Sequence, residues 1–128
     1  MKPQIVAMGG GGFATEPENL LLEQYVLSLS RNRTRPRVCF LPTASGDSEN
    51  YIERFYTSFG ELDAVPSHLP LFGLTVRDIR AFLLGQDVIF VGGGNTLNML
   101  PRYLTGSPNL GTIIVSPLQA IGVGYVFL

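Results

Sequence analysis

Short apolar runs alternate along this chain with segments whose apolar residues recur at helical spacing. The runs cover residues 4–8, 38–41 and 88–91, and each is closed by glycine or proline, as is typical of strands buried inside a parallel sheet. The helical spacing appears in residues 20–29, 51–59 and 79–83. This alternation predicts an α/β fold with three αβα layers and a mostly parallel sheet.

Turn and cap residues predict where these elements begin. Thr15 begins a capping box and predicts a first helix that runs to about Ser30. Asp47 or Ser48 predicts the start of the second helix, and residues 75–78 predict the start of the third. A weaker strand at 64–69 contains a proline, which cannot donate to a ladder, so we expect it at or near a sheet edge.

The last part of the chain differs from the rest, because residues 103–128 carry no formal charge. Pro101 is expected to break the helix that begins after Asn95. Further strands are expected at 112–115 and 124–128. We expect one domain over 1–128, with a core at 1–100 and a divergent tail at 101–128.

Charge and cysteine content exclude several classes of function. Nine Lys and Arg against ten Asp and Glu give a formal charge of −1, which makes nucleic acid an unexpected partner. Glycine, proline and glutamine interrupt the apolar tail before it reaches the length of a membrane span. The single cysteine permits no intrachain disulfide, and no signal peptide is recognisable, so we expect the cytoplasm. One His, one Cys and dispersed carboxylates predict neither a metal site nor a cofactor.

Two glycine clusters are the main candidate for a binding site. They cover residues 9–12 and 92–94, and each follows a predicted parallel strand, so both should lie at the same edge of the sheet. Without Cβ atoms, glycines can turn successive backbone N–H groups toward an anion or an oxyanion. The residues predicted to do so are Gly93, Gly94, Asn95 and Thr96, with Gly10, Gly11 and Gly12 as a secondary glycine loop.

Individual side chains offer little for catalysis. His68 is the only conventional general base, and an ordinary partly exposed histidine is the simpler interpretation. Cys39 lies inside a strand and is expected to pack rather than react. Ser45 and Ser48 are expected in turns and caps, and Ser116 lacks the Gly-x-Ser-x-Gly frame of an α/β nucleophile.

Two patterns leave alternatives to a peptide-binding site. The run Gly9-x-Gly11-x-x-Ala14 fits a dinucleotide fingerprint, but the second strand ends in Leu41 and Pro42 where a ribose-binding acid would be wanted. The basic residues of 31–37 are expected to form a solvated loop rather than a phosphate site.

Three segments together resemble the peptidase E family. They are Ile5-Val-Ala-Met-Gly-Gly-Gly-Gly12, Phe40-Leu-Pro-Thr-Ala-Ser45 and Val88-Ile-Phe-Val-Gly-Gly-Gly-Asn-Thr96. The resemblance covers about residues 4–100 and is to the amino-terminal part of these aspartyl dipeptidase and cyanophycinase-like enzymes. It implies a class I glutamine amidotransferase-like (flavodoxin-like) fold and a serine peptidase that acts on small peptides with an amino-terminal Asp.

The sequence departs from the family pattern after residue 100. The resemblance implies a Gly-x-Ser-Ala-Gly elbow followed by a histidine and an acid, and none of these occurs beyond Gly92. Only the oxyanion loop, residues 93–96, is carried over, and no catalytic nucleophile, histidine or acid is assigned. We therefore expect this chain to be inactive alone, as a truncated or frame-shifted product would be.

Two other functional hypotheses remain open. The chain could be a non-catalytic α/β module that binds an anion or a nucleotide in its glycine turns. It could also build a peptidase site from two chains, since an open sheet edge or an apolar tail often pairs with a partner, which makes a homodimer an open alternative.

Overall fold

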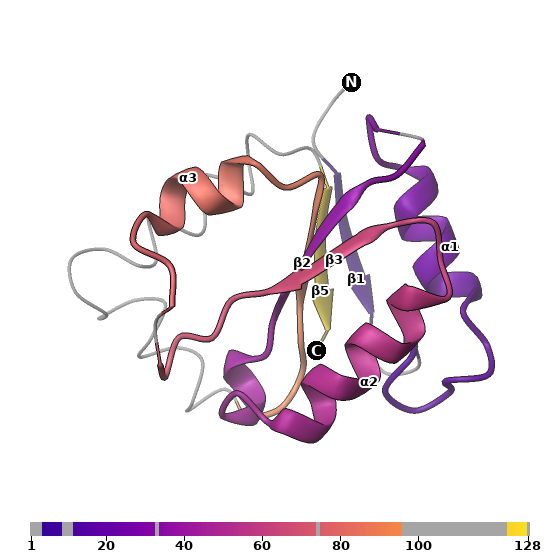
Figure 1. Cartoon of the computed structure of the whole chain (residues 1–128). Helices are drawn as coiled ribbons and strands as arrows, with labels where there is room; N and C mark the ends of the chain where they lie inside the picture. Colours follow the sequence, from indigo (N-terminus) through magenta and orange to yellow (C-terminus); the bar gives the residue numbers. More distant parts are fainter. Residues whose placement is uncertain (1–3, 9–11, 33, 74, 96–122, 128) are drawn as a thin grey trace.

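The computed structural model describes residues 4–8, 12–32, 34–73, 75–95 and 123–127, which form an α/β fold with a parallel sheet (Figure 1). The strands are β1 (Gln4–Met8), β2 (Arg37–Leu41), β3 (Val65–His68), β4 (Val88–Val91) and β5 (Val123–Phe127). The helices are α1 (Leu21–Ser28), α2 (Glu49–Gly60) and α3 (Ile79–Leu84), with a 3-10 turn, η1, at Thr43–Ser45. The sheet has the order β1-β5-β4-β2-β3, and every pairing in it is parallel.

Two hydrophobic clusters show that the sheet is covered on both faces. The first joins α1 and α2 to one face, and the second joins α3 to the other. In β2, Val38 and Phe40 belong to the first cluster, whereas Cys39 and Leu41 belong to the second, as the two-residue period of a strand requires. The predicted three-layer α/β fold is therefore confirmed.

The first cluster is dominated by aromatic rings. Phe40 of β2 stacks on Phe55 of α2 with ring centroids 4.9 Å apart, and Phe13 meets Phe40 edge to face at 6.0 Å. Phe59 and Phe90 complete this group and are almost fully buried. These large rings fix α2 and the segment that follows β1 against the same face of the sheet.

The sequence predicted the second and third helices closely. Ser48 is the N-cap of α2, because its side chain accepts from the Tyr51 N–H. Asp78 is the N-cap of α3 and accepts from the Ala81 N–H. The proline-containing strand, β3, lies at the sheet edge as predicted.

The predicted start of the first helix was wrong. Thr15 lies in a turn, and α1 begins six residues later at Leu21. The apolar face predicted for this helix, which comprised Leu20, Leu21, Tyr25, Val26 and Leu29, was also partly wrong. Tyr25 is 54% exposed, whereas Glu23 is fully buried. The carboxylate of Glu23 accepts a hydrogen bond from the Phe13 N–H at 2.7 Å, and this long-range contact decides which face of α1 points inward.

The strand predicted near the end of the chain is present as β5, and it pairs with β1 on one side and β4 on the other. The strand predicted at 112–115 and the helix predicted after Asn95 lie outside the described residues.

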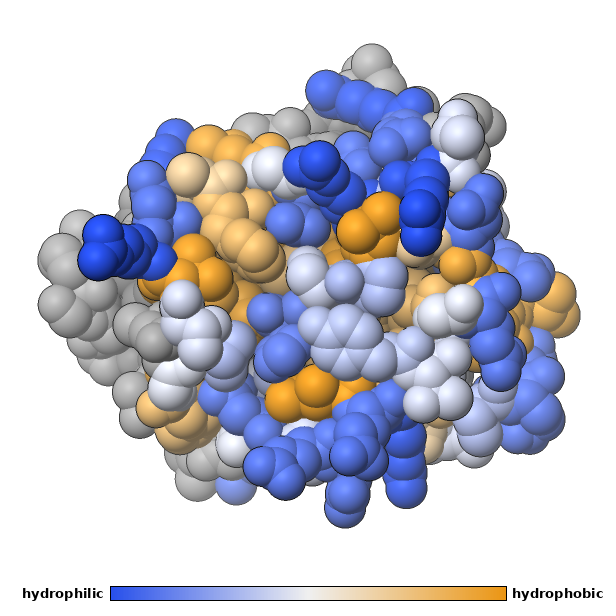
Figure 2. All heavy atoms as spheres, in the orientation of Figure 1, coloured by the Kyte–Doolittle hydropathy of each residue, from blue (hydrophilic) through white to orange (hydrophobic). Residues whose placement is uncertain are grey.

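Within the part of the chain that the structure describes, no helix is long and apolar enough to cross a membrane. Figure 2 shows this face of the molecule, with hydrophilic residues prominent over α2 and hydrophobic residues grouped over α3.

Candidate functional site

The glycine loop that follows β4, residues 92–95, is tied to the segment that follows β2. The Gly92 N–H donates to the Leu41 carbonyl at 3.0 Å and continues the ladder between the strands. The Asn95 N–H donates to the Ala44 carbonyl of η1 at 2.7 Å. Two loops that are far apart in sequence are thus held together at the carboxyl edge of the sheet, where open α/β folds place their ligands.

Position 94 of this loop accepts only glycine. Its φ is +147°, a conformation that side chains with a Cβ rarely adopt. A Cβ atom would also meet the Ala44 carbonyl oxygen and would lie 2.6 Å from its carbon. The third glycine therefore permits the close approach of the two backbones that the Asn95 to Ala44 hydrogen bond requires.

Tyr51 of α2 lies against the same loop and was not singled out from the sequence. A Cβ atom on Gly92 would be 3.0 Å from Cε1 of Tyr51 and 2.7 Å from a ring carbon of Phe40. Burial raises the pKa of the Tyr51 hydroxyl, and a hydrogen bond from the Gly93 backbone opposes that rise. The signal available in the sequence was a lone tyrosine on a phenylalanine-rich helix face, because a buried tyrosine hydroxyl needs a polar partner.

The backbone donors of the loop differ in what they can offer a ligand. The Gly93 N–H points toward the Tyr51 hydroxyl, and the Asn95 N–H is bonded to Ala44. The Gly94 N–H has no hydrogen-bond acceptor among the described residues. Thr96 lies outside the described residues. The oxyanion role of residues 93–96 remains a prediction, and Gly94 is the donor best placed for it.

The glycine cluster after β1 is described only at its end. Gly12 has a φ of +75°, and its carbonyl accepts from the Thr15 and Glu16 N–H groups at 3.2 and 2.8 Å. This turn directs Phe13 into the core. Gly10 and Gly11 lie outside the described residues, so their role as a secondary loop also remains a prediction. Because β1 and β4 are both parallel to β5, their carboxyl ends share one edge of the sheet.

Cys39 is placed as a packing residue, as expected. It is fully buried, and burial raises the pKa of its thiol from 9.0 to about 12, against a smaller lowering by a hydrogen bond with Ser67. Such a thiol carries almost no thiolate near neutral pH, and the thiolate is the nucleophilic form.

Three of the remaining candidate side chains, His68, Ser45 and Ser48, form hydrogen bonds within the protein. His68 lies on edge strand β3, with Nδ1 2.7 Å from the Tyr56 hydroxyl. The Ser45 hydroxyl donates to the Pro42 carbonyl at 2.7 Å, and Ser48 caps α2, so both serve turns and caps as predicted. Ser116 lies outside the described residues.

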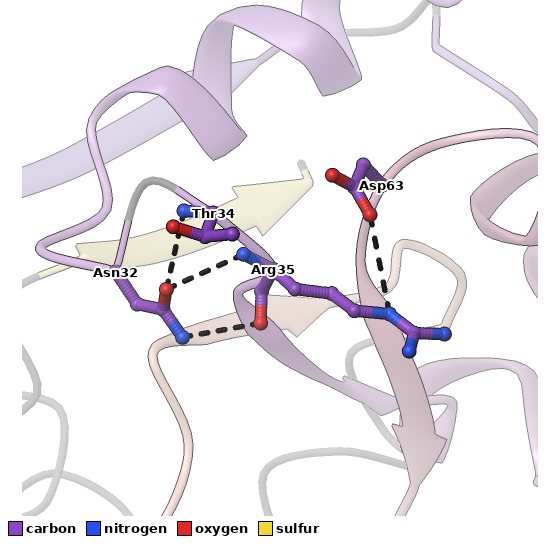
Figure 3. A network of polar contacts seen from close by, with 4 residues as sticks. All are labelled: Asn32, Thr34, Arg35 and Asp63. Atoms are coloured by element: carbon purple, nitrogen blue, oxygen red, sulfur yellow. Dashed lines mark hydrogen bonds and ion pairs between the residues drawn. The ribbon is translucent and has the colours of Figure 1, made fainter.

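The basic loop between α1 and β2 is organised by one asparagine (Figure 3). The Asn32 side-chain oxygen accepts from the Thr34 and Arg35 N–H groups at 3.2 and 3.3 Å. Arg35 also lies 4.0 Å from Asp63, but both side chains are mostly exposed, so this ion pair contributes little. The geometry agrees with a solvated connection.

A hollow of about 550 Å³ lies between the end of α1, the start of β2 and the α2–β3 connection; it is lined by Gln24, Leu27, Ser28, Thr34, Pro36, Glu61, Leu62 and Asp63. It belongs to the amino edge of the sheet, away from the predicted site. Among the described residues, no group of His, Cys, Asp and Glu side chains could hold a metal ion.

Comparison with known proteins places these features in one family. The sequence profile of Peptidase family S51 matches residues 5–115. The chain is 62% identical over 97 residues to the uncharacterized peptidase YgaJ of Bacillus subtilis (strain 168), a match that covers 76% of this chain and 42% of that protein.

Two crystal structures share the fold. One is named as a peptidase E protein from Listeria monocytogenes EGD-e and superposes with a TM-score of 0.69 at 18% identity over 98% of this chain and 58% of its own. The other, a peptidase from an acI-B1 Actinobacterium, superposes with a TM-score of 0.71 at 21% identity over 99% of this chain and 54% of its own.

The chain thus spans less than half of its curated relative and a little over half of each solved structure. The profile match includes the loop at residues 92–95, which follows β4. The chain belongs to peptidase family S51.

Proposed function

We infer that this chain supplies the oxyanion side of a peptidase E-like serine peptidase site, whose substrates are small peptides with an amino-terminal Asp. The observation that carries this proposal is the match to Peptidase family S51 over residues 5–115, which includes the loop at 92–95. In acyl transfer, fixed backbone donors stabilise the negative charge that develops on the carbonyl oxygen. The Gly94 N–H, which has no acceptor among the described residues, is the donor suited to that task.

The chain is expected to be inactive on its own. Hydrolysis by a serine peptidase needs a nucleophile and a base that removes its proton. The sequence has one histidine, His68, and that residue is bonded to Tyr56 on edge strand β3. Cys39 is buried and protonated. These side chains cannot act together at the glycine loop, so this part of the fold would position a substrate without cleaving it.

A fusion with the remaining part of a relative tests the proposal directly. The part of YgaJ outside the 97 matched residues is fused after the matched region of this chain, and hydrolysis of Asp-Leu and Ala-Leu dipeptides is followed by release of the free amino acids. We expect no turnover by the chain alone and turnover of Asp-Leu in preference to Ala-Leu by the fusion. A fusion that is folded by circular dichroism yet inactive on both dipeptides would contradict the proposal.

A ligand screen separates this function from the non-catalytic alternative. A ligand that binds only the folded state raises the unfolding temperature. The chain alone should be stabilised by an aspartyl dipeptide and not by inorganic phosphate or a nucleotide. Stabilisation by phosphate or nucleotide alone would instead indicate an anion-binding module.

A further inference from the structure

The ring of Tyr51 is held in one position beside the glycine loop. It meets Phe40 edge to face with 4.8 Å between ring centroids, and its centroid lies 5.5 Å from that of Phe13. A Cβ atom at Gly92 would be 3.0 Å from Cε1 of Tyr51, so glycine at position 92 leaves just enough room for this ring edge. Contacts with two aromatic rings and with the loop backbone fix the ring and, with it, the position of the hydroxyl.

The Tyr51 hydroxyl has more hydrogen-bonding capacity than the described residues use. A tyrosine hydroxyl can donate its hydrogen as well as accept one. Here it accepts from the Gly93 backbone, and the described residues contain no acceptor for its own hydrogen. Burial raises the pKa of this hydroxyl from its ordinary value of 10.0, so the hydrogen is present at neutral pH. An O–H group is therefore left to donate at the carboxyl edge of the sheet.

A second donor lies one residue further along the same loop. The Gly94 N–H also lacks an acceptor among the described residues. Gly93, which bonds to the tyrosine hydroxyl, immediately precedes Gly94, and consecutive Cα atoms are about 3.8 Å apart. The Tyr51 O–H and the Gly94 N–H are therefore separated by about one residue, a spacing that one tetrahedral anion can span.

The start of α2 makes this edge of the sheet favourable for negative charge. Ser48 caps the helix and accepts from the Tyr51 N–H, so Tyr51 lies in the first helical turn, where the backbone N–H groups carry a partial positive charge. Asp47 adds an opposing charge before the cap, but one of its carboxylate oxygens already accepts from the Phe72 N–H at 2.8 Å.

We propose that the Tyr51 hydroxyl is a second hydrogen-bond donor of the candidate site, which acts together with the Gly94 N–H on the negatively charged oxygen of a tetrahedral ligand. In peptide hydrolysis that oxygen is the oxyanion that forms when a nucleophile adds to the scissile carbonyl. The hydroxyl keeps its proton and forms no covalent bond. This inference rests on the proposed function for the identity of the substrate, whereas the pair of donors is tested by binding alone.

Binding of a tetrahedral anion to the chain tests this donor without relying on turnover. The probe is the phosphonate analogue of aspartate, in which a phosphonate replaces the α-carboxyl group, and isothermal titration calorimetry measures its Kd. Tyr51→Phe keeps the ring and removes only the hydroxyl. We expect Kd to rise about tenfold, as for the loss of a hydrogen bond to a charged group. Tyr56→Phe is the matched control on the same helix, because the Tyr56 hydroxyl bonds to His68 at 2.7 Å, and it should leave Kd unchanged.

Three results would overturn the proposal. Absence of binding by the unsubstituted chain would show that these donors do not form an anion site. An unchanged Kd in Tyr51→Phe, together with a lower free energy of unfolding in urea, would show that the hydroxyl only supports the loop. Equal losses of affinity in Tyr51→Phe and Tyr56→Phe would show a general effect of removing a hydroxyl from α2.

The proposed function is judged separately, by the fusion with the remaining part of YgaJ. An inactive fusion, beside a chain whose phosphonate binding depends on Tyr51, would contradict the peptidase and not the donor. In an active fusion, Tyr51→Phe should lower kcat about tenfold with little change in KM, because the oxyanion exists only after the nucleophile has added. An unchanged kcat would contradict the donor and not the peptidase.

Discussion

At the scale of single residues, Gly94 shows how one position controls the candidate site. Its φ of +147° and the nearby Ala44 carbonyl leave no room for a Cβ atom. We expect Gly94→Ala to lower the free energy of unfolding by about 2 kcal/mol, through backbone strain and displacement of Ala44. Urea unfolding measures this loss. The control is Gly60→Ala, because a Cβ atom there meets nothing within 4 Å.

The control should behave in the opposite way. Gly60 is the last residue of α2 and does not have a positive φ, so alanine fits its backbone without strain and should raise stability by about 0.4–1 kcal/mol. Equal stability of the Gly94→Ala and unsubstituted chains would show that the loop can move away from Ala44, and the claim that only glycine fits at this position would then be wrong.

Cys39 links burial to a dependence of stability on pH. Its pKa is raised from 9.0 to about 12 in the folded chain. Above pH 9 the unfolded chain loses this proton first, so the unfolded state binds fewer protons and stability falls as pH rises. The loss is at most about 1.4 kcal/mol per pH unit, and it begins near pH 9 and ends near pH 12. Below pH 9 the thiol is protonated in both states and has no effect.

Urea unfolding at a series of pH values between about 8 and 10 tests this account. In that range we expect the free energy of unfolding to decline more steeply for the unsubstituted chain than for Cys39→Ala. The upper limit of this pH range matters, because burial also raises the pKa of Tyr51 and Tyr56 above 10.0. At higher pH these tyrosines add to the loss of stability. Parallel declines in the two chains would contradict the assignment to Cys39.

At the scale of elements, local signals were sufficient for α2 and α3 and misleading for α1. The caps Ser48 and Asp78 bond to N–H groups three residues ahead, so the sequence contains the whole interaction. The first helix instead depends on Glu23, whose partner Phe13 is ten residues away. A capping pattern at Thr15 could not reveal a contact that forms only when the Gly12 turn brings Phe13 into the core.

Glu23 therefore offers a test of what anchors the segment between β1 and α1. Glu23→Ala leaves the buried Phe13 N–H without its acceptor, which should cost about 1–3 kcal/mol of stability. Glu23→Gln retains an oxygen at that position and should lose less. Thermal and urea unfolding compare the two, with the exposed Glu18→Ala as control. Equal losses for Gln and Ala would show that the Phe13 hydrogen bond is not the anchor.

At the scale of the whole molecule, the sequence predicted the layers better than the order of the strands. Runs such as residues 88–91, which are apolar at every position, indicated a parallel sheet with helices on both faces. All four residues of β4 are indeed buried. The position of β5 between β1 and β4 could not be predicted, because it depends on pairing between the two ends of the chain. For the same reason the sequence could not show that β1, an interior strand by composition, lies at an edge.

Edge strand β3 offers no backbone donor at Pro66, and one substitution can supply it. Pro66→Val restores an outward N–H and adds a β-branched side chain on a strand whose neighbours already pair with β2. We expect self-association that increases with protein concentration, since an open edge is a template for another strand. Both chains also carry Ile5→Lys, because Ile5 is 75% exposed on β1, the other edge strand, and a charge there keeps that edge from associating.

Analytical ultracentrifugation at increasing concentration measures this effect. Val65→Thr in the same background is the matched control, because the Val65 N–H already donates to the Pro36 carbonyl at 2.8 Å and the substitution exposes no new backbone donor. A Pro66→Val chain that stays monomeric would mean that the Tyr56 and His68 pair, with rings 5.5 Å apart, closes the edge without the proline. In that case Tyr56→Phe added to Pro66→Val should produce the association, because it removes the hydroxyl that meets the outward His68 N–H.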